Sequence, residues 1–185
     1  MLKTLKKPTT LLLIFVLAVD LLIFQLSINH YYFAFLKYSG IPIPAMITVI
    51  AIFLFVRSFN ISTFELIAIS IIAFLILVVI IFVHSIKDFT IDSVTSPSGK
   101  ETLTIEHRNA TLGETTHIYN FYRNTTFPGV IKKINKDKVT IITHESSSTP
   151  DDLDVLGIDN VQWLNGEGVI FNSSYAKTKV DFFGH

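Results

Sequence analysis

The sequence predicts a protein in two parts: three transmembrane helices followed by a small all-β domain, either an antiparallel sheet or a sandwich. The segment 66–83 has eighteen residues with Ser70 as its one polar interruption, the length and purity of a membrane-spanning helix. The formal charge is +3 over residues 1–84 and −3 over residues 85–185. Beyond residue 100, polar and apolar residues alternate as in strands. We therefore expect a transmembrane domain over 1–88 and a β domain over 89–185.

The first span is predicted at about residues 9–29. Lys3, Lys6 and Lys7 give the chain a basic start, and Pro8 stands where a helix can begin. The apolar run that follows is long, and residues 27–32 offer no pair of small residues for signal peptidase. The segment is therefore expected to be an uncleaved anchor rather than a signal peptide.

The second and third spans are predicted at about residues 41–57 and 63–84, joined by a tight loop. The second is short, because sixteen apolar residues cover about 24 Å of a hydrocarbon layer of about 30 Å. Tyr38 and a snorkelling Arg57 would extend it. Ser62 and Glu65 have the spacing of a capping box at the start of the third span.

The topology follows from the basic residues and from the aromatic segment 29–40, which surrounds Lys37 and is typical of the headgroup region. Basic residues favour the cytoplasmic side. The N-terminus is therefore expected in the cytoplasm and, after three spans, the β domain outside. The predicted localisation is the cell membrane, with the lipid bilayer as the first partner.

Asp20 is the unusual residue of the first span, because a carboxylate in mid-bilayer costs about 2.5–3.5 kcal/mol on insertion scales. Such residues are functional candidates. A protonated Asp20 that bonds to Thr48 or Ser70 inside a packed bundle, or that contacts a partner helix, is the favoured interpretation. An ion or proton pathway is the alternative, and it would require oligomers.

Seven strands are predicted in the second half. Leu103, Ile105 and His107 alternate with polar residues in the first of them. Asn165-Gly166 is the strongest short hairpin signal, and Asn135-Lys136-Asp137-Lys138 is interpreted as the tip of another hairpin. Residues 85–95 are expected to be a linker and residues 145–154 a mobile loop. The predicted strands cover 102–108, 116–123, 130–134, 139–143, 160–164, 167–171 and 179–183.

One resemblance follows from three short segments: Ser96-Pro97-Ser98-Gly99-Lys100, Val161-Gln162-Trp163 and Val169-Ile170-Phe171. Together they resemble one blade of the Ser-Pro-Asp-Gly-Lys … Trp … Ile-x-Phe β-propeller repeat. Ser98 replaces the usual Asp, and the pattern occurs once, whereas a closed propeller needs several repeats. Joined to N-terminal spans, the pattern is similar to uncharacterised small membrane proteins of Gram-positive bacteria. That resemblance implies an extracytoplasmic β domain and no particular activity.

The composition excludes several chemistries. Cysteine is absent, which excludes disulfides, thiol catalysis and thiolate metal sites. The acidic, mixed-charge second half does not suggest nucleic acid as a partner, and no Gly-rich phosphate loop is present. Ser146-Ser147-Ser148 lacks a nucleophile-elbow pattern. Asp151, Asp152 and Asp154 lack the Gly and Glu of a calcium loop, so a solvated acidic loop is expected.

The histidines of the second half, His107, His117, His144 and His185, lack the spacing of a zinc site. We therefore predict surface or rim histidines, with no metal and no cofactor. A metal-dependent or other enzyme is the alternative, and it requires His107, His117 and His144 to converge.

The strand 116–123 is the main candidate for binding. If its His117, Tyr119, Phe121 and Arg123 face were exposed, it would form an interaction patch. Otherwise Tyr119 and Phe121 belong to the core and Tyr122 is the exposed ring. The candidate partner-binding residues are Asp20, Tyr119, Tyr122, Arg123 and Trp163.

The predicted function is the binding of a partner protein, as a non-enzymatic accessory, sensory or immunity-type membrane subunit. An enzyme that uses the histidines and a small transporter or channel component that uses Asp20 are the alternatives.

Overall fold

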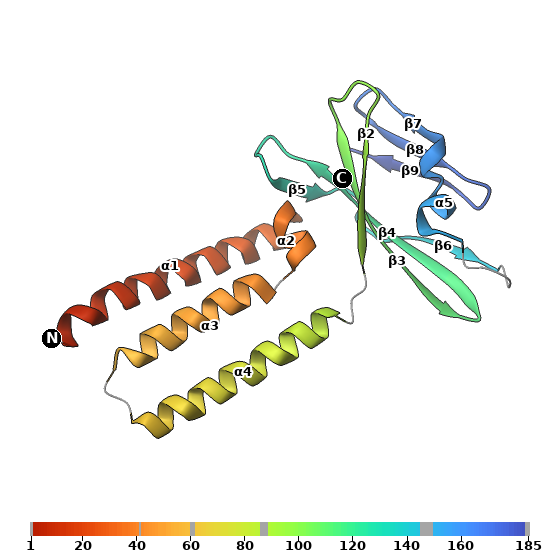
Figure 1. Ribbon diagram of the computed structural model, residues 1–185. Coiled ribbons are helices and arrows are strands. Elements are labelled where there is room, and N and C mark those ends of the chain that lie inside the picture. Colours follow the sequence, from red (N-terminus) through yellow and green to blue (C-terminus); the bar gives the residue numbers. More distant parts are fainter. Residues whose placement is uncertain (1, 41, 60–61, 86–88, 145–149, 184–185) are drawn as a thin grey trace. The chain divides into compact units, whose positions relative to one another are not determined.

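The chain folds as two compact units, residues 1–87 and 88–185. Figure 1 presents the computed structural model, which describes residues 2–40, 42–59, 62–85, 89–144 and 150–183. The described part of the first unit is mainly helical, and that of the second unit forms antiparallel β-sheets. N-terminal apolar helices followed by antiparallel sheets are as the sequence predicts.

The first unit contains the helices α1 (Leu2–Ile28), α3 (Pro42–Arg57) and α4 (Thr63–Ser85), and α3 packs against both of the others. Among the described residues, two stretches are long and apolar enough to cross a membrane by length and composition, Pro8–Ile28 and Thr63–Val83. The helix α3 is apolar but has 16 residues.

The ends of two helices agree with the sequence prediction at one position and differ from it at another. The Ser62–Glu65 capping box is confirmed, because the Ser62 N–H donates to Glu65 Oε2 at 2.9 Å and the Glu65 N–H donates to Ser62 Oγ at 3.3 Å. The predicted helix start at Pro8 is wrong, because α1 begins at Leu2. Pro8 thus lies inside α1, although proline in a helix interior removes one hydrogen bond and crowds the carbonyl four residues earlier.

The aromatic segment between α1 and α3 contains a short extended stretch, β1 (Tyr31–Phe33), and a helix of six residues, α2 (Ala34–Ser39). Lys37 Nζ lies 5.0 Å from the centre of the Tyr32 ring, a cation–π distance. Gly40 ends α2 with φ of 70°, which glycine adopts without steric cost.

The second unit has two antiparallel sheets in its described residues, and β4 has a neighbour on each side in the first. In that sheet β3 pairs with β2 and β4, while β5 and β6 both pair with β4. In the other, the order is β7-β8-β9. The strands are β2 (Thr90–Thr95), β3 (Thr102–Leu112), β4 (Glu114–Asn124), β5 (Val130–Lys133), β6 (Val139–Thr143), β7 (Val161–Trp163), β8 (Gly168–Asn172) and β9 (Lys177–Asp181).

Two segments differ from the prediction. The expected linker 85–95 contains β2, which pairs with β3 along its whole length. The expected mobile loop 145–154 lies partly outside the described residues, but its end forms a helix, α5 (Asp152–Leu156), followed by a 3₁₀ turn (Ile158–Asn160). Asp151 caps α5, since its side chain accepts the Leu153 N–H. The acidic residues therefore start a helix.

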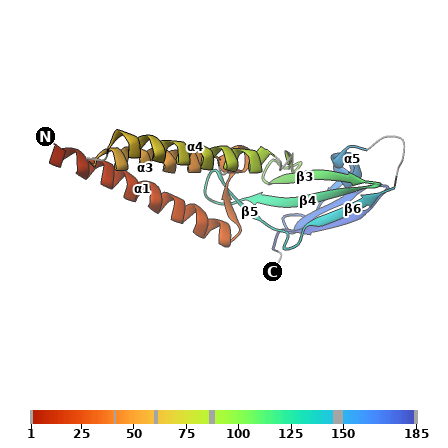
Figure 2. The same cartoon turned by 90° about the horizontal axis from the view of Figure 1, so that it is seen from below.

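The predicted hairpin around residues 135–138 is wrong, because β5 and β6 do not pair with each other. Both run antiparallel to β4: β5 pairs with residues 122–124 and β6 pairs with residues 115–119. The two strands therefore follow β4 like a single strand with an interruption (Figure 2). At the interruption, Asn135 Oδ1 accepts the Phe121 N–H at 2.7 Å. Its side chain thus replaces the missing backbone acceptor.

The two turns that short sequence motifs predict, at residues 96–100 and at Asn165-Gly166, are present. Gly99 N–H donates to the Ser96 carbonyl at 2.8 Å, which closes the turn between β2 and β3. Asn165 and Gly166 have φ of 38° and 88°, as a type I′ hairpin between β7 and β8 requires.

The core of the second unit lies between its two sheets. Phe121 on β4 stacks on Phe171 on β8, with ring centres 5.6 Å apart. The buried apolar residues of this core are Leu103, Ile105, Tyr119, Phe121, Ile141, Val155, Leu156, Val169, Phe171, Val180 and Phe182.

Candidate functional site

A cluster of polar side chains, with two buried histidines at its centre, surrounds Asp152, the first residue of α5. Gly157 ends this helix in the left-handed conformation, with φ of 86°, and its N–H bonds to the carbonyls of Leu153 and Asp154. A Cβ atom at Gly157 would lie 2.5 Å from the backbone oxygen of Asn172. A glycine is therefore required where α5 ends against β8, and this position helps to fix Asp152 over the first sheet.

The histidines of the cluster come from the two longest strands. In the β3–β4 register, His107 lies opposite Tyr119 and Asn109 lies opposite His117. Alternate residues of a strand share one face, so these four side chains face the same side of the sheet. Leu103, Ile105 and Phe121 continue that face into the apolar core.

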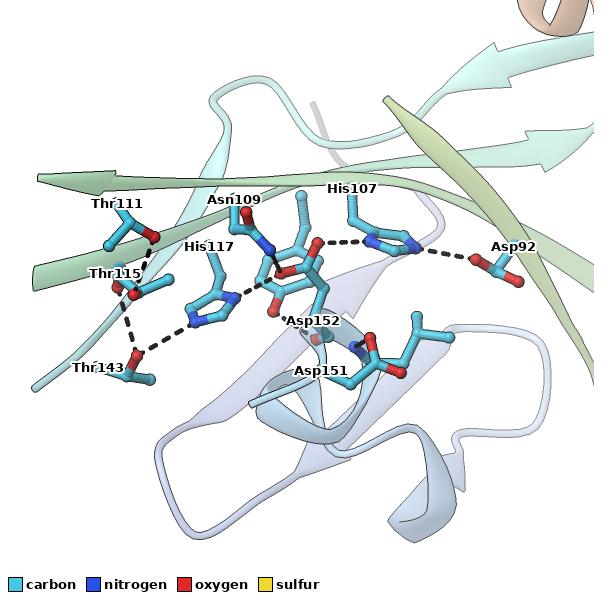
Figure 3. A network of polar contacts seen from close by, with 11 residues as sticks. Asp92, His107, Asn109, Thr111, Thr115, His117, Thr143, Asp151 and Asp152 are labelled. Carbon is cyan, nitrogen blue, oxygen red and sulfur yellow. Dashed lines mark hydrogen bonds and ion pairs between the residues drawn. The ribbon is translucent and has the colours of Figure 1, made fainter. Parts of the chain in front are cut away.

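Asp152 binds both histidines, one through each carboxylate oxygen (Figure 3). His107 Nδ1 lies 2.8 Å from Oδ2, and His117 Nδ1 lies 2.5 Å from Oδ1. Asn109 Nδ2 donates to Oδ1 at 3.1 Å. The backbone carbonyl of Asp152 accepts the Tyr119 hydroxyl at 2.6 Å. The strands β3 and β4 thus hold α5 by both its side chain and its backbone.

His107 stands between two carboxylates, because its Nε2 also lies 2.9 Å from Asp92 Oδ2 on β2. A neutral imidazole has a single N–H, whereas the imidazolium donates to both. Burial alone would lower the pKa of His107, but the hydrogen bonds and charges of Asp152 and Asp92 raise it above its ordinary value. Conversely, burial would raise the pKa of Asp152, but bonds from His107, His117 and Asn109 lower it.

His117 has a different second partner, since its Nε2 lies 3.2 Å from the Thr143 hydroxyl on β6. A hydroxyl can donate or accept, so the contact suits either ring tautomer. Burial, together with the charges of Asp152 and Asp151, raises the pKa of Tyr119, which keeps its hydroxyl a donor.

The centre of the cluster is buried, whereas Asn109 and Asp92 at its margin are partly accessible to solvent. His107, His117 and Asp152 are 4%, 0% and 5% exposed, and the polar atoms described above bond to one another. Such an arrangement is suited to joining β2, β3, β4, β6 and α5.

The prediction of surface or rim histidines is therefore wrong for His107 and His117, whose strands turn them inward. His144 does not join them: it is exposed and lies 3.1 Å from Glu114. The described residues include no group of three or more His, Cys, Asp or Glu side chains placed to hold a metal ion. His185 lies outside the described residues.

The candidate binding residues of strand β4 do not form an exposed patch. Tyr119 and Phe121 lie in the core, and Tyr122, expected to be exposed in that case, is buried with its hydroxyl donating to Glu106 at 2.8 Å. Alternation along β4 turns Tyr119 toward α5, which is why the patch does not form.

Arg123 and Trp163 are engaged within the second unit. The Arg123 guanidinium donates to Glu101 at 2.9 Å and lies 4.9 Å from the centre of the Phe182 ring. Trp163 packs on the same ring, with centres 6.0 Å apart.

Asp20 has the contact that the sequence suggested. The Thr48 hydroxyl on α3 lies 2.6 Å from Asp20 Oδ2 and 2.9 Å from the Pro44 carbonyl. Ser70, the other suggested partner, instead donates to the carbonyl of Leu66 in its own helix at 2.7 Å. Asp20 therefore joins α1 to α3.

An exposed apolar surface, which the sequence analysis did not identify, lies on the face of the first sheet opposite the cluster. We call Ala110, Leu112, Ile118 and Ile142 the outer apolar face, since the register puts them on one side of β3, β4 and β6. Leu112 is 97% exposed and Ile142 is 51% exposed. The sequence gives little signal for this surface, because Glu114 and Thr116 occupy the same-side positions between Leu112 and Ile118.

No known family, curated protein or solved structure matches this chain. Function therefore follows from the geometry of the chain itself.

Proposed function

We propose that the chain is a multi-pass membrane protein whose helices α1, α3 and α4 cross the bilayer. We further propose that its β unit lies outside the cytoplasm and binds a partner protein without catalysing a reaction. The observation that carries the membrane assignment is the exposure of α1 and α4: 6% and 0% of their most apolar stretches are buried within the protein.

The physical argument is that these helices need an apolar environment. Burying one large apolar side chain is worth about 1.5–3 kcal/mol, and α4 alone exposes many of them. A helix satisfies its own backbone hydrogen bonds, as a bilayer requires. The exposed residues of α4 include Ile67, Ile71, Ile72, Phe74, Leu75, Ile76, Val79 and Phe82.

The orientation is supported by the basic residues. Lys3, Lys6 and Lys7 precede the first span, and Arg57 lies in the last turn of α3. With three spans, both positions are cytoplasmic, as the distribution of basic residues in membrane proteins favours, and the β unit is outside.

The burial of both histidines of the cluster around Asp152 supports a binding protein rather than an enzyme. Its two histidines come together with one carboxylate, but they are buried and bonded, and His144 is elsewhere. Likewise, the Asp20–Thr48 bond supports a packing contact between helices over an ion pathway.

The outer apolar face is the surface that best fits a partner protein. Protein interfaces combine exposed apolar side chains with polar neighbours. Here Thr116 lies between Ala110 and Ile142, while Thr140 and the Glu114–His144 pair lie beside the other apolar residues. A protein partner suits this combination of exposed leucine and isoleucine with charged neighbours.

The test is a crosslinking pull-down of the intact protein from its native membrane. Three forms are compared with the wild type: a chain ending after Lys87, the double variant Leu112→Ser/Ile142→Ser, and Phe127→Ser as control. Phe127 is 73% exposed and lies in the loop between β4 and β5. All three substituted residues are exposed, so the fold should be retained.

We expect one partner that is captured by the wild type and by Phe127→Ser. The truncated chain should lose it, and the double variant should recover about tenfold less, which corresponds to about 1.4 kcal/mol. Full capture by the double variant would refute the outer apolar face as the interface. If no form captures a stoichiometric partner, the binding function is wrong.

A further inference from the structure

His107 joins three elements of the second unit through one ring. It stands on β3, its Nδ1 contacts Asp152 on α5, and its Nε2 contacts Asp92 on β2. In the β2–β3 register, Thr90 lies opposite His107 and Asp92 lies opposite Ile105. Asp92 thus reaches His107 diagonally on the inner face, as Figure 3 shows.

The two carboxylates are not equivalent. The Asp152 side chain is 7% exposed and also binds His117 and Asn109. The Asp92 side chain is 40% exposed. Water can therefore replace His107 more readily as a partner of Asp92 than as a partner of Asp152.

The other groups named around His107 do not replace the hydrogen bond that its Nε2 proton makes to Asp92. From β4, His117 donates to Asp152 and Tyr119 donates to the Asp152 backbone. From α5, Asp151 adds a further negative charge close to Tyr119. On β3 itself, Asn109 is uncharged. The surroundings are acidic overall, so they favour the imidazolium.

We propose that His107 is a protonation-controlled clasp on β2: with both ring nitrogens protonated it holds Asp92, and loss of the Nε2 proton releases Asp92 and loosens β2. The Nδ1 proton stays on His107 and continues to bond Asp152, the better buried partner. The released proton goes to solvent through the exposed side of Asp92.

The position of β2 in the chain determines which part of the β unit the protonation of His107 would affect. It is the first strand after α4, and within the described part of the second unit it pairs with β3. Its opening therefore changes the end of the β unit that the chain enters from the helices. The pKa of His107 is raised above the ordinary 6.5, so β2 should loosen above neutral pH rather than below it.

The experiment measures amide hydrogen exchange of residues 90–95 in the full chain in lipid nanodiscs. It is made at about pH 5.5 and about pH 8.5, on either side of the histidine range, and corrected for intrinsic exchange rates. We expect β2 to open about fivefold more often at the higher pH, the size of a partly exposed charge pair. The amides of β9, an edge strand of the other sheet, should show no such change.

Asp92→Asn is the informative variant, because it keeps the size of the side chain and removes its charge. In this variant the pH dependence of β2 exchange should disappear. The ¹³C-detected titration midpoint of His107, assigned by His107→Gln, should move to lower pH. Equal pH dependence in the wild type and Asp92→Asn, or β2 protection that is constant across this range, would overturn the clasp. The outcome does not depend on membrane topology or partner binding.

Discussion

Asp152 shows at the scale of one residue what a buried carboxylate needs. An isolated charge in a protein core is too costly to persist, so it must be paired and hydrogen-bonded. Here two histidines and one asparagine satisfy it, and the backbone of the same residue accepts from Tyr119. One side chain thus orders the contact between α5 and the first sheet.

Replacement of Asp152 by alanine should therefore be strongly destabilising. His107 and His117 would lose their shared acceptor inside the core, at a cost of about 3–5 kcal/mol. Urea unfolding of the full chain in detergent, followed by the fluorescence of Trp163, measures this loss, because the single tryptophan lies in the second unit.

The neighbouring Asp151 provides the matched control. It is exposed and serves as the N-cap of α5, so Asp151→Ala should cost only about 1 kcal/mol. Equal losses for the two variants would mean that Asp152 acts as a helix residue and that the cluster adds little.

At the scale of elements, the length of β4 explains why the predicted hairpin around residues 135–138 does not form. Residues 130–134 and 139–143 have the pattern of a hairpin, since a polar tip separates two apolar runs. The long β4 instead offers both runs a continuous edge, and they occupy it in succession. Asn135 makes this possible by accepting the Phe121 N–H where the strand is interrupted.

Asn135→Ala should accordingly destabilise the second unit by about 1–3 kcal/mol, because the Phe121 N–H would lose its acceptor. Lys136→Ala, one residue along in the exposed loop, should stay within about 0.5 kcal/mol of the wild type. The unfolding midpoint by Trp163 fluorescence compares the two. A neutral Asn135→Ala would show that the interruption does not need a side-chain acceptor.

Local signals were sufficient for some elements and not for others. Asn165-Gly166 and Ser62–Glu65 could be predicted because the residues that decide them are neighbours in sequence. Asp20–Thr48 could be predicted because the apolar helices offer few polar partners. Asp152 was missed because its histidines are 35 and 45 residues away. Two histidines on inward-facing positions of adjacent strands were the available signal that a buried partner was required.

At the scale of the whole molecule, the cluster makes stability depend on pH in a defined direction. The pKa of Asp152 is lowered from 3.8 and that of His107 is raised from 6.5. The contribution of Asp152 is present above 3.8 and is lost as the pH falls through its lowered folded-state pKa. The contribution of His107 is complete below 6.5 and is lost as the pH rises through its raised folded-state pKa.

The stability of the second unit should therefore be greatest between about pH 4 and 6.5 and should fall toward alkaline pH. Unfolding midpoints of the full chain over this range, read by Trp163, measure it. In Asp92→Asn the alkaline fall should be smaller, because one of the two charges that favour the imidazolium is gone. A maximum near pH 8 would contradict the assignment of His107.

The membrane topology can be measured directly because the chain has no cysteine. Lys136→Cys, in the exposed loop between β5 and β6, and Thr63→Cys, at the start of α4, each place one thiol on a different side of the proposed bilayer. In intact cells, a membrane-impermeant maleimide should label Lys136→Cys, whereas Thr63→Cys should react only after permeabilisation. Labelling of Thr63→Cys without permeabilisation, or protection of Lys136→Cys, would contradict a membrane protein that presents its β unit outside the cell.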